Sequence, residues 1–157
     1  GALVEYVGDF PAERFDHVHL WQEDPFAALD WYRTHLNAPV RTGFTPPTPA
    51  ERQVRRGPDR SWPSLTQDGM FREPRAGVVF GDVVLTWYGN QWDTPLVSSR
   101  GQLQDHIGFA VTDLDAWAAK LRDEGVTFLE PPYRLGDTRA FMIEGPSREA
   151  LELVEVR

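Results

Sequence analysis

The chain has 157 residues, 41% of them hydrophobic, and a formal net charge of −8. This length and apolar content suit one compact domain or two small half-domains that share a core. The acidic balance argues against a nucleic-acid-binding protein, because such binding needs a basic face that displaces counterions. The absence of cysteine excludes a disulfide framework, a cysteine-based zinc site and a thiol nucleophile.

Membrane segments and targeting signals are not evident in the sequence. No apolar run approaches the roughly 20 residues that a membrane-spanning helix needs, so we expect no membrane partner. The compartment is not identified by the sequence, and a cytoplasmic location is the default. Because the chain starts at Gly1 and not at Met, an exported mature form that has lost a signal peptide is also compatible with it.

The first part of the chain predicts an N-terminal arm followed by a strand and a helix. Residues 1–14 are expected to be irregular, and the alternating residues 15–21 favour a strand. Asp24 as N-cap and Pro25 at the first helical position predict an amphipathic helix that ends at about Leu36. Three short strands should complete this module, at residues 40–44, 77–80 and 83–88.

A long segment rich in Pro and Arg interrupts this first module, which we place at residues 15–90. Residues 45–75 hold six of the 13 prolines and a cluster of four arginines. A loop of this length inside a compact domain is typically a functional lid or a disordered insert. The arginines fit either the binding of an anionic substrate or a solvated basic loop; they are Arg52, Arg55, Arg56 and Arg60.

A linker at residues 91–104 leads to a second module at residues 105–157. It predicts a strand at 105–111, an N-cap at Asp113 and a helix that stops at Gly125. Three strands should follow, at about residues 126–129, 139–143 and 150–156.

The second module weakly repeats the first, with His106 standing 89 residues after His17. Asp-His-Val at the start of the first module is matched by Asp-His-Ile in the second, and Asp24 is matched by Asp113. The predicted fold is therefore α+β, with two tandem βαβββ modules whose curled mixed sheets surround a central cavity.

Strand alternation predicts which side chains share a face. His17, His19 and Trp21 should lie on the sheet face opposite the first helix, and His106 should lie on the equivalent face of the repeated strand. Glu152 joins the histidine face on the final strand. If the two sheets curl toward each other, His17, His106 and Glu152 converge. Two neutral imidazoles and a carboxylate suit divalent Fe, Mn, Zn, Ni or Co and leave positions for water or substrate.

Simpler interpretations exist for each of these residues. A strand histidine is often only a hydrogen-bonded core or surface group, and Glu152 could be a charge on an edge strand. His19 could be a fourth ligand or a proton shuttle, but a lining or hydrogen-bonding role is favoured. His35 is expected to complement the dipole at the end of the first helix. Asp16 and Asp105 are expected to point to the opposite face as strand-start hydrogen-bond acceptors.

Three stretches of the sequence resemble the vicinal oxygen chelate superfamily: FDHVHLWQEDPFAALDWYRTHL, QDHIGFAVTDLDAWAAKLRDEGV and FMIEGPSREALELVEV. This superfamily includes glyoxalase, bleomycin-resistance proteins, extradiol dioxygenases, fosfomycin-resistance enzymes and methylmalonyl-CoA epimerase. The resemblance spans nearly the whole chain except the N-terminal arm and residues 45–75. It implies metal ligands at His17, His106 and Glu152.

The resemblance places the remaining ligand position of the family at about Thr86. Glyoxalases and the epimerase are expected to have Glu or Gln there, so Thr86 departs from their pattern. A set of two histidines and one glutamate is similar to that of the extradiol dioxygenases and the fosfomycin-resistance enzymes.

The function that the resemblance implies is a metal-dependent enzyme that chelates vicinal oxygens of a small substrate on a divalent cation. The reaction would be dioxygenase-like or that of a lyase or isomerase, and His19 or Tyr88 is expected to assist proton transfer. The alternative is a non-catalytic protein that binds or sequesters a small molecule, because bleomycin-resistance proteins share the fold and generally lack the metal. A homodimer is compatible with the family, whose members often pair modules between subunits.

Overall fold

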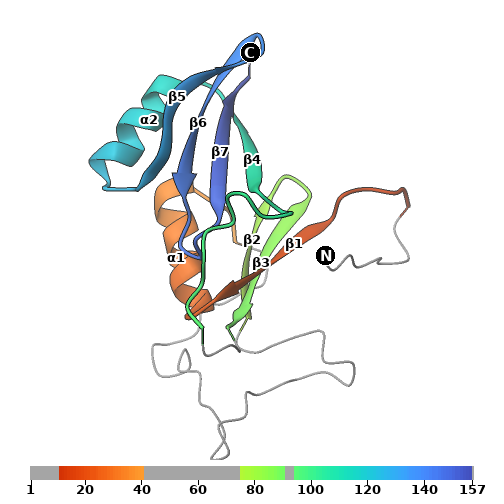
Figure 1. The fold of residues 1–157 in the computed structure, drawn as a ribbon. Helices are drawn as coiled ribbons and strands as arrows, with labels where there is room; N and C mark the ends of the chain where they lie inside the picture. Colours follow the sequence, from red (N-terminus) through yellow and green to blue (C-terminus); the bar gives the residue numbers. More distant parts are fainter. Residues whose placement is uncertain (1–10, 41–74, 91–93, 157) are drawn as a thin grey trace, which may run out of the picture. The chain divides into compact units, whose positions relative to one another are not determined.

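A computed structural model describes residues 11–40, 75–90 and 94–156 of the chain (Figure 1). The chain divides into two compact units, Gly8–Leu96 and Val97–Arg157, and each is described by itself. Residues 41–74, which include nearly all of the predicted Pro- and Arg-rich loop, lie outside the described part. Of the strand expected at residues 40–44, only Val40 lies among the described residues, and it forms an isolated bridge with Val78.

The first unit contains one helix and a three-stranded sheet in the order β1-β3-β2. Strand β1 runs parallel to β3, whereas β2 runs antiparallel to it. The elements are β1 (His17–Gln22), α1 (Pro25–Leu36), β2 (Arg75–Phe80) and β3 (Val83–Gly89). The predicted helix and the two predicted later strands are thereby confirmed, each to within a few residues.

Helix α1 begins and ends where its capping residues predict. The Asp24 carboxylate accepts hydrogen bonds from the backbone N–H groups of Phe26 and Ala27, and Pro25 opens the helix. Asn37 ends it in the left-handed conformation, at φ 53°. The inner face of the helix includes Tyr32, whose ring lies 4.7 Å from that of Trp87 on β3. This contact fixes which face of the sheet the helix covers.

The other face of the sheet carries the histidines. His17 and His19 stack with ring centroids 4.5 Å apart, and Tyr88 packs edge-on against His19. Trp21 lies beside Tyr88, at 6.2 Å between ring centroids. His17, His19 and Trp21 therefore share the face opposite α1, as the alternation predicts.

The second unit contains one helix and a four-stranded sheet in the order β4-β7-β6-β5. Strand β4 runs parallel to β7, and the other neighbouring pairs are antiparallel. The elements are β4 (His106–Val111), α2 (Leu114–Asp123), β5 (Phe128–Leu135), β6 (Thr138–Glu144) and β7 (Ala150–Glu155). Both units thus pair their first strand in parallel with their last strand, which fits the predicted α+β fold of two modules.

Helix α2 closes one face of the second sheet. Asp113 caps it by accepting a hydrogen bond from the N–H of Ala116, although Asp113 itself is left-handed at φ 55°. The helix buries Leu114, Ala118 and Leu121. The apolar residues of β7, Leu151 and Leu153, are also buried, whereas Glu152 between them is part-exposed. Glu152 therefore lies on the sheet face opposite the helix.

Strand β5 differs from its prediction. It runs from Phe128 to Leu135 and not over residues 126–129, and its pairing with β6 shifts register twice. The second shift lies between Glu130 and Tyr133, where Pro131 and Pro132 interrupt the ladder. Proline has no N–H to donate, so it is tolerated at bulges and on edge strands such as this one.

The strand registers show which positions of the two units correspond. In the second unit His106 pairs with Ala150 and Gly108 pairs with Glu152. In the first unit His17 pairs with Val84 and His19 pairs with Thr86. Thr86 therefore holds the position that Glu152 holds in the second unit, as the sequence comparison predicts. No helix in the described part of the chain is long and apolar enough to cross a membrane.

Candidate functional site

Two of the three predicted metal ligands lie side by side in the second unit. His106 opens β4, and Glu152 lies on the adjacent parallel strand β7. The His106 Nε2 atom is 3.6 Å from Glu152 Oε2. The side chain of Glu152 is only 12% exposed, whereas that of His106 is 37% exposed. A nitrogen and an oxygen donor thus meet at the open face of the sheet.

This pair fits two ligand positions of a divalent cation. Bonds from such ions to imidazole nitrogen and carboxylate oxygen are about 2.0–2.2 Å long, so two ligand atoms on one ion lie roughly 3–3.5 Å apart. The observed separation of 3.6 Å is close to that span. The described residues of either unit contain no group of three His, Asp or Glu side chains that could hold a metal ion by themselves. A cation held by His106 and Glu152 would therefore complete its coordination with ligands other than these two side chains.

The second ring nitrogen of His106 is held by the residue before it. Asp105 accepts a hydrogen bond from His106 Nδ1 at 2.8 Å, from the N–H of Gly101 at 2.5 Å and from the guanidinium of Arg100. The Gly101 bond, followed by those of His106 and Arg100, lowers the pKa of Asp105 to about 2. Nδ1 of His106 is thus engaged by Asp105, and Nε2 is the ring nitrogen that faces Glu152.

Arg100 links this pair to strand β5. Its guanidinium contacts the carboxylates of both Asp105 and Glu130, and these contacts raise the pKa of the guanidinium. Arg100 and His106 Nδ1 both contact Oδ1 of Asp105, and the contact of Arg100 with Glu130 connects this aspartate to β5.

Glu152 is held in the same way by Tyr133. The Tyr133 hydroxyl donates to Glu152 Oε1, the carboxylate oxygen that does not face His106. Burial raises the pKa of Tyr133, and the bond to Glu152 raises it further. Tyr133 is therefore a protonated donor at neutral pH. Both candidate ligands have one atom fixed by a neighbour and one atom directed toward the other ligand.

The first unit repeats the aspartate-histidine pair. His17 Nδ1 lies 2.8 Å from Asp16 Oδ2, and this bond, with help from Arg14, lowers the pKa of Asp16. The prediction that Asp16 and Asp105 accept hydrogen bonds is correct, but the prediction that they point away from the histidine face is wrong. Strands β1 and β4 begin at the histidines, so the alternation of a strand does not apply to the residue before them.

His19 and Tyr88, the predicted proton-transfer residues, also lie together. The Tyr88 hydroxyl is 3.5 Å from His19 Nε2. Thr86 lies on β3, two residues before Tyr88, and is in register with His19 on β1. His17 and His19 belong to the first unit, whereas His106 and Glu152 belong to the second. The convergence of His17, His106 and Glu152 on one ion therefore stays a prediction.

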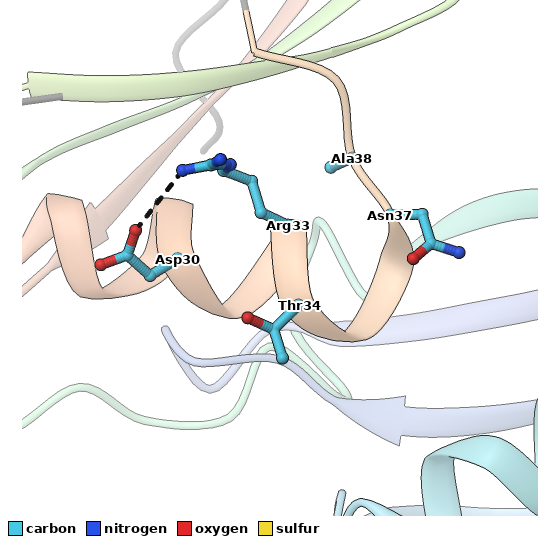
Figure 2. Close-up of a pocket in the computed structure, with 5 residues that line it drawn as sticks. All are labelled: Asp30, Arg33, Thr34, Asn37 and Ala38. Carbon is cyan, nitrogen blue, oxygen red and sulfur yellow. Dashed lines mark ion pairs between the residues drawn. The ribbon is translucent and has the colours of Figure 1, made fainter. Parts of the chain in front are cut away.

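A separate pocket of about 400 Å³ lies along α1 (Figure 2). Two of the residues that line it, Asp30 and Arg33, form an ion pair of 4.0 Å. None of the residues that line this pocket is a candidate ligand or a candidate proton-transfer residue. Its lining residues are Asp30, Arg33, Thr34, Asn37 and Ala38.

Tyr133, Arg100 and Glu130 are site residues that the sequence analysis misses. The one available signal is the pair Pro131-Pro132, because consecutive prolines beside an apolar strand indicate a bulge that can redirect a side chain. Nothing in the local pattern marks Arg100, which lies in the segment predicted as a linker.

Comparisons with known proteins agree with the fold of the two units. The family model of the Glyoxalase/Bleomycin resistance protein/Dioxygenase superfamily matches residues 14–153. None of the curated protein sequences matches the chain significantly.

Solved structures of similar fold have low sequence identity to this chain. A member of the same superfamily from Sphaerobacter thermophilus DSM 20745 has 17% identity and a TM-score of 0.61, over 94% of this chain and 100% of its own. Lactoylglutathione lyase from Agrobacterium tumefaciens has 16% identity and a TM-score of 0.56, over 92% and 95%. Fosfomycin resistance protein FosX from Mesorhizobium loti has 13% identity and a TM-score of 0.56, over 93% and 94%.

At these identities the solved structures establish the architecture and leave the reaction open. The family model, in contrast, covers most of the sequence, including His17, His106 and Glu152. The chain belongs to the Glyoxalase/Bleomycin resistance protein/Dioxygenase superfamily.

Proposed function

We propose that the protein is a metal-dependent enzyme in which His106 and Glu152 hold a divalent cation that chelates two adjacent oxygens of a small substrate. The observation that carries this proposal is the 3.6 Å approach of His106 Nε2 to Glu152 Oε2, with the other polar atom of each side chain already engaged. His17, with the same aspartate partner, is the proposed third ligand.

The donor set restricts the metal. Imidazole nitrogen and carboxylate oxygen suit divalent Fe, Mn, Zn, Ni or Co, whereas the absence of cysteine disfavours thiolate-selected metals. When bound, such a cation supplies Lewis-acid stabilisation of negative charge that develops on a substrate oxygen. The two aspartates keep the imidazoles in the tautomer that a metal needs.

Proton transfer is assigned to His19 and Tyr88. The Tyr88 hydroxyl and His19 Nε2 are 3.5 Å apart, so the pair can hold one proton near the histidine face and pass it to a substrate atom. Thr86 cannot act as the carboxylate or carboxamide ligand that glyoxalases and the epimerase are expected to have. We therefore assign three protein ligands and a dioxygenase-like or lyase/isomerase reaction.

Metal content tests the proposal directly. Protein purified without chelators and titrated in turn with the five metals should bind one equivalent of at least one of them. His106→Ala should abolish this binding and His17→Ala should weaken it. His35→Ala is the matched control, because His35 packs against Trp31 on α1, the helix that covers the sheet face opposite His17. A native chain that binds none of the five metals, or a His106→Ala variant that binds as well as the native chain, would refute the proposal.

The bound metal then distinguishes the reactions. Iron together with oxygen consumption on catechol-type substrates would identify a dioxygenase. Zinc or nickel together with isomerisation of a thiol adduct would identify a glyoxalase-type lyase, in spite of Thr86.

Capture of a small aromatic molecule without chemistry is the second candidate function. The observation that favours it is the row of rings on the histidine face, where Trp21, Tyr88 and His19 follow one another and Trp21 is 38% exposed. Such rings can stack on a planar ligand. Metal-free protein whose ligand binding is unchanged in His106→Ala would support this function, and a required metal would exclude it.

A further inference from the structure

The Glu152 carboxylate accepts a hydrogen bond from a residue two strands away in the sheet of the second unit. Its Oε1 atom accepts from the Tyr133 hydroxyl, while Oε2 faces His106 Nε2 at 3.6 Å. Tyr133 belongs to β5, which is separated from β7 by β6 in the sheet order of the second unit. The contact therefore reaches across the middle strand.

The bulge in β5 makes this contact geometrically feasible. In a regular strand Glu130 and Tyr133, three residues apart, would point to opposite faces. The register shift between them pairs Glu130 with Met142 and Tyr133 with Ala140. Met142 in turn pairs with Glu152, so all of these side chains share one face. The irregularity at Pro131-Pro132 thus turns the Tyr133 hydroxyl toward the candidate site.

The hydroxyl also determines how Glu152 can bind an ion. A free carboxylate can hold a cation through one oxygen or through both. With Oε1 occupied by the Tyr133 proton, the oxygen that faces His106 is the one left to donate. Resting on the proposed function, we propose that Tyr133 is a positioning residue that makes Glu152 a one-oxygen ligand of the cation and aims that oxygen at the position shared with His106.

Cobalt binding to the full chain tests this inference with readouts that do not depend on activity. Tyr133→Phe removes one hydroxyl and keeps the ring. It should weaken Co²⁺ binding about 10- to 100-fold, the usual cost of losing a partner of a metal ligand. The visible absorption of the bound Co²⁺ should also fall in intensity, because release of Oε1 lets the carboxylate bind through both oxygens and raises the coordination number.

Two control variants separate positioning from general damage. Tyr32→Phe removes a hydroxyl from a fully buried tyrosine of α1, in the other unit and on the helix side of its sheet. Leu135→Ala alters an exposed residue at the end of β5. Both should bind Co²⁺ with native affinity and spectrum. Thermal unfolding of each variant identifies a temperature at which all of them are folded for the titration.

The outcomes separate the inference from the function on which it rests. Weaker binding and a changed spectrum in Tyr133→Phe alone support the positioning role. Native affinity and spectrum in Tyr133→Phe, with the native chain binding one Co²⁺, overturn the role of Tyr133 and leave the metal site intact. A native chain that binds neither Co²⁺ nor any of the other four metals overturns both the role of Tyr133 and the proposed function.

Discussion

The turn before the last strand should not tolerate a side chain at Gly145. A Cβ atom built there would lie 2.4 Å from the Cδ atom of Glu149 and 2.6 Å from its Oε1. Glu149 is only 3% exposed, and its Oε2 accepts a 2.7 Å hydrogen bond from the N–H of Ser147. The added methyl group of Gly145→Ala must therefore displace a buried carboxylate from its partner.

The loss of stability in Gly145→Ala can be estimated from the hydrogen bond between Ser147 and Glu149 that this displacement breaks. Leaving a buried donor unpaired costs about 1–3 kcal/mol, and overpacking of a filled site costs a similar amount. Because the carboxyl group is the end of a flexible chain, it moves and the backbone does not, so the two effects are alternatives and do not sum. We expect Gly145→Ala to lower the free energy of unfolding by about 1–3 kcal/mol in urea denaturation.

A double-mutant cycle tests the reasoning, because Glu149→Ala removes the group that the methyl would meet. In that background Gly145→Ala should cost less than about 0.5 kcal/mol, which gives a coupling energy of about 1 kcal/mol or more. Gly108→Ala is the matched control, since a Cβ at Gly108 has no atom within 4 Å. Equal costs of Gly145→Ala in the two backgrounds, or a native-like Gly145→Ala, would refute the argument.

Three further predictions concern a helix cap, an ion pair and the aspartate-histidine pairs. Asp24→Ala should cost about 1 kcal/mol in urea unfolding, because it leaves the N–H groups of Phe26 and Ala27 without their side-chain acceptor; an unchanged stability contradicts the cap. The hydrogen bond from Arg139 lowers the pKa of Glu155 below its ordinary 4.5, so the stability it provides is present above that value and is lost as the pH falls through the lower, folded-state pKa. The deficit of Glu155→Gln relative to the native chain should be largest at about pH 6 and shrink toward about pH 3, and a constant deficit argues against the ion pair. Asp105→Asn and Asp16→Asn should each weaken Co²⁺ binding about 10- to 100-fold by calorimetry, whereas native affinity in both would show that the aspartates do not orient the imidazoles.

The elements that carry their own start and stop signals could be predicted from the sequence. Asp24 and Asp113 cap their helices as expected, and Gly125, at φ 74°, follows the end of α2. The correspondence of Thr86 with Glu152, expected from the duplicated modules of the family, agrees with the registers of the two sheets. These features depend on local chemistry or on duplication, both of which a single sequence records.

The hydrogen bonds around Glu152 could not be predicted, because they depend on a β-bulge in β5. The bulge places one extra residue between Glu130 and Tyr133 relative to β6. Alternation assumes a regular strand, and by that rule Tyr133 faces away from Glu130. Only the register of β5 against β6 shows where the bulge lies. In the same way, the position of the Asp105 carboxylate is set by Gly101 and Arg100, which precede the strand and have no periodic pattern.

Pro131 and Pro132 have a second consequence, for self-association. Strand β5 is the outermost strand of its sheet, where a free edge would offer backbone donors to a strand of another molecule. Two consecutive exposed residues there have no N–H to offer. Growth of the sheet by addition of a second copy at β5 is therefore disfavoured.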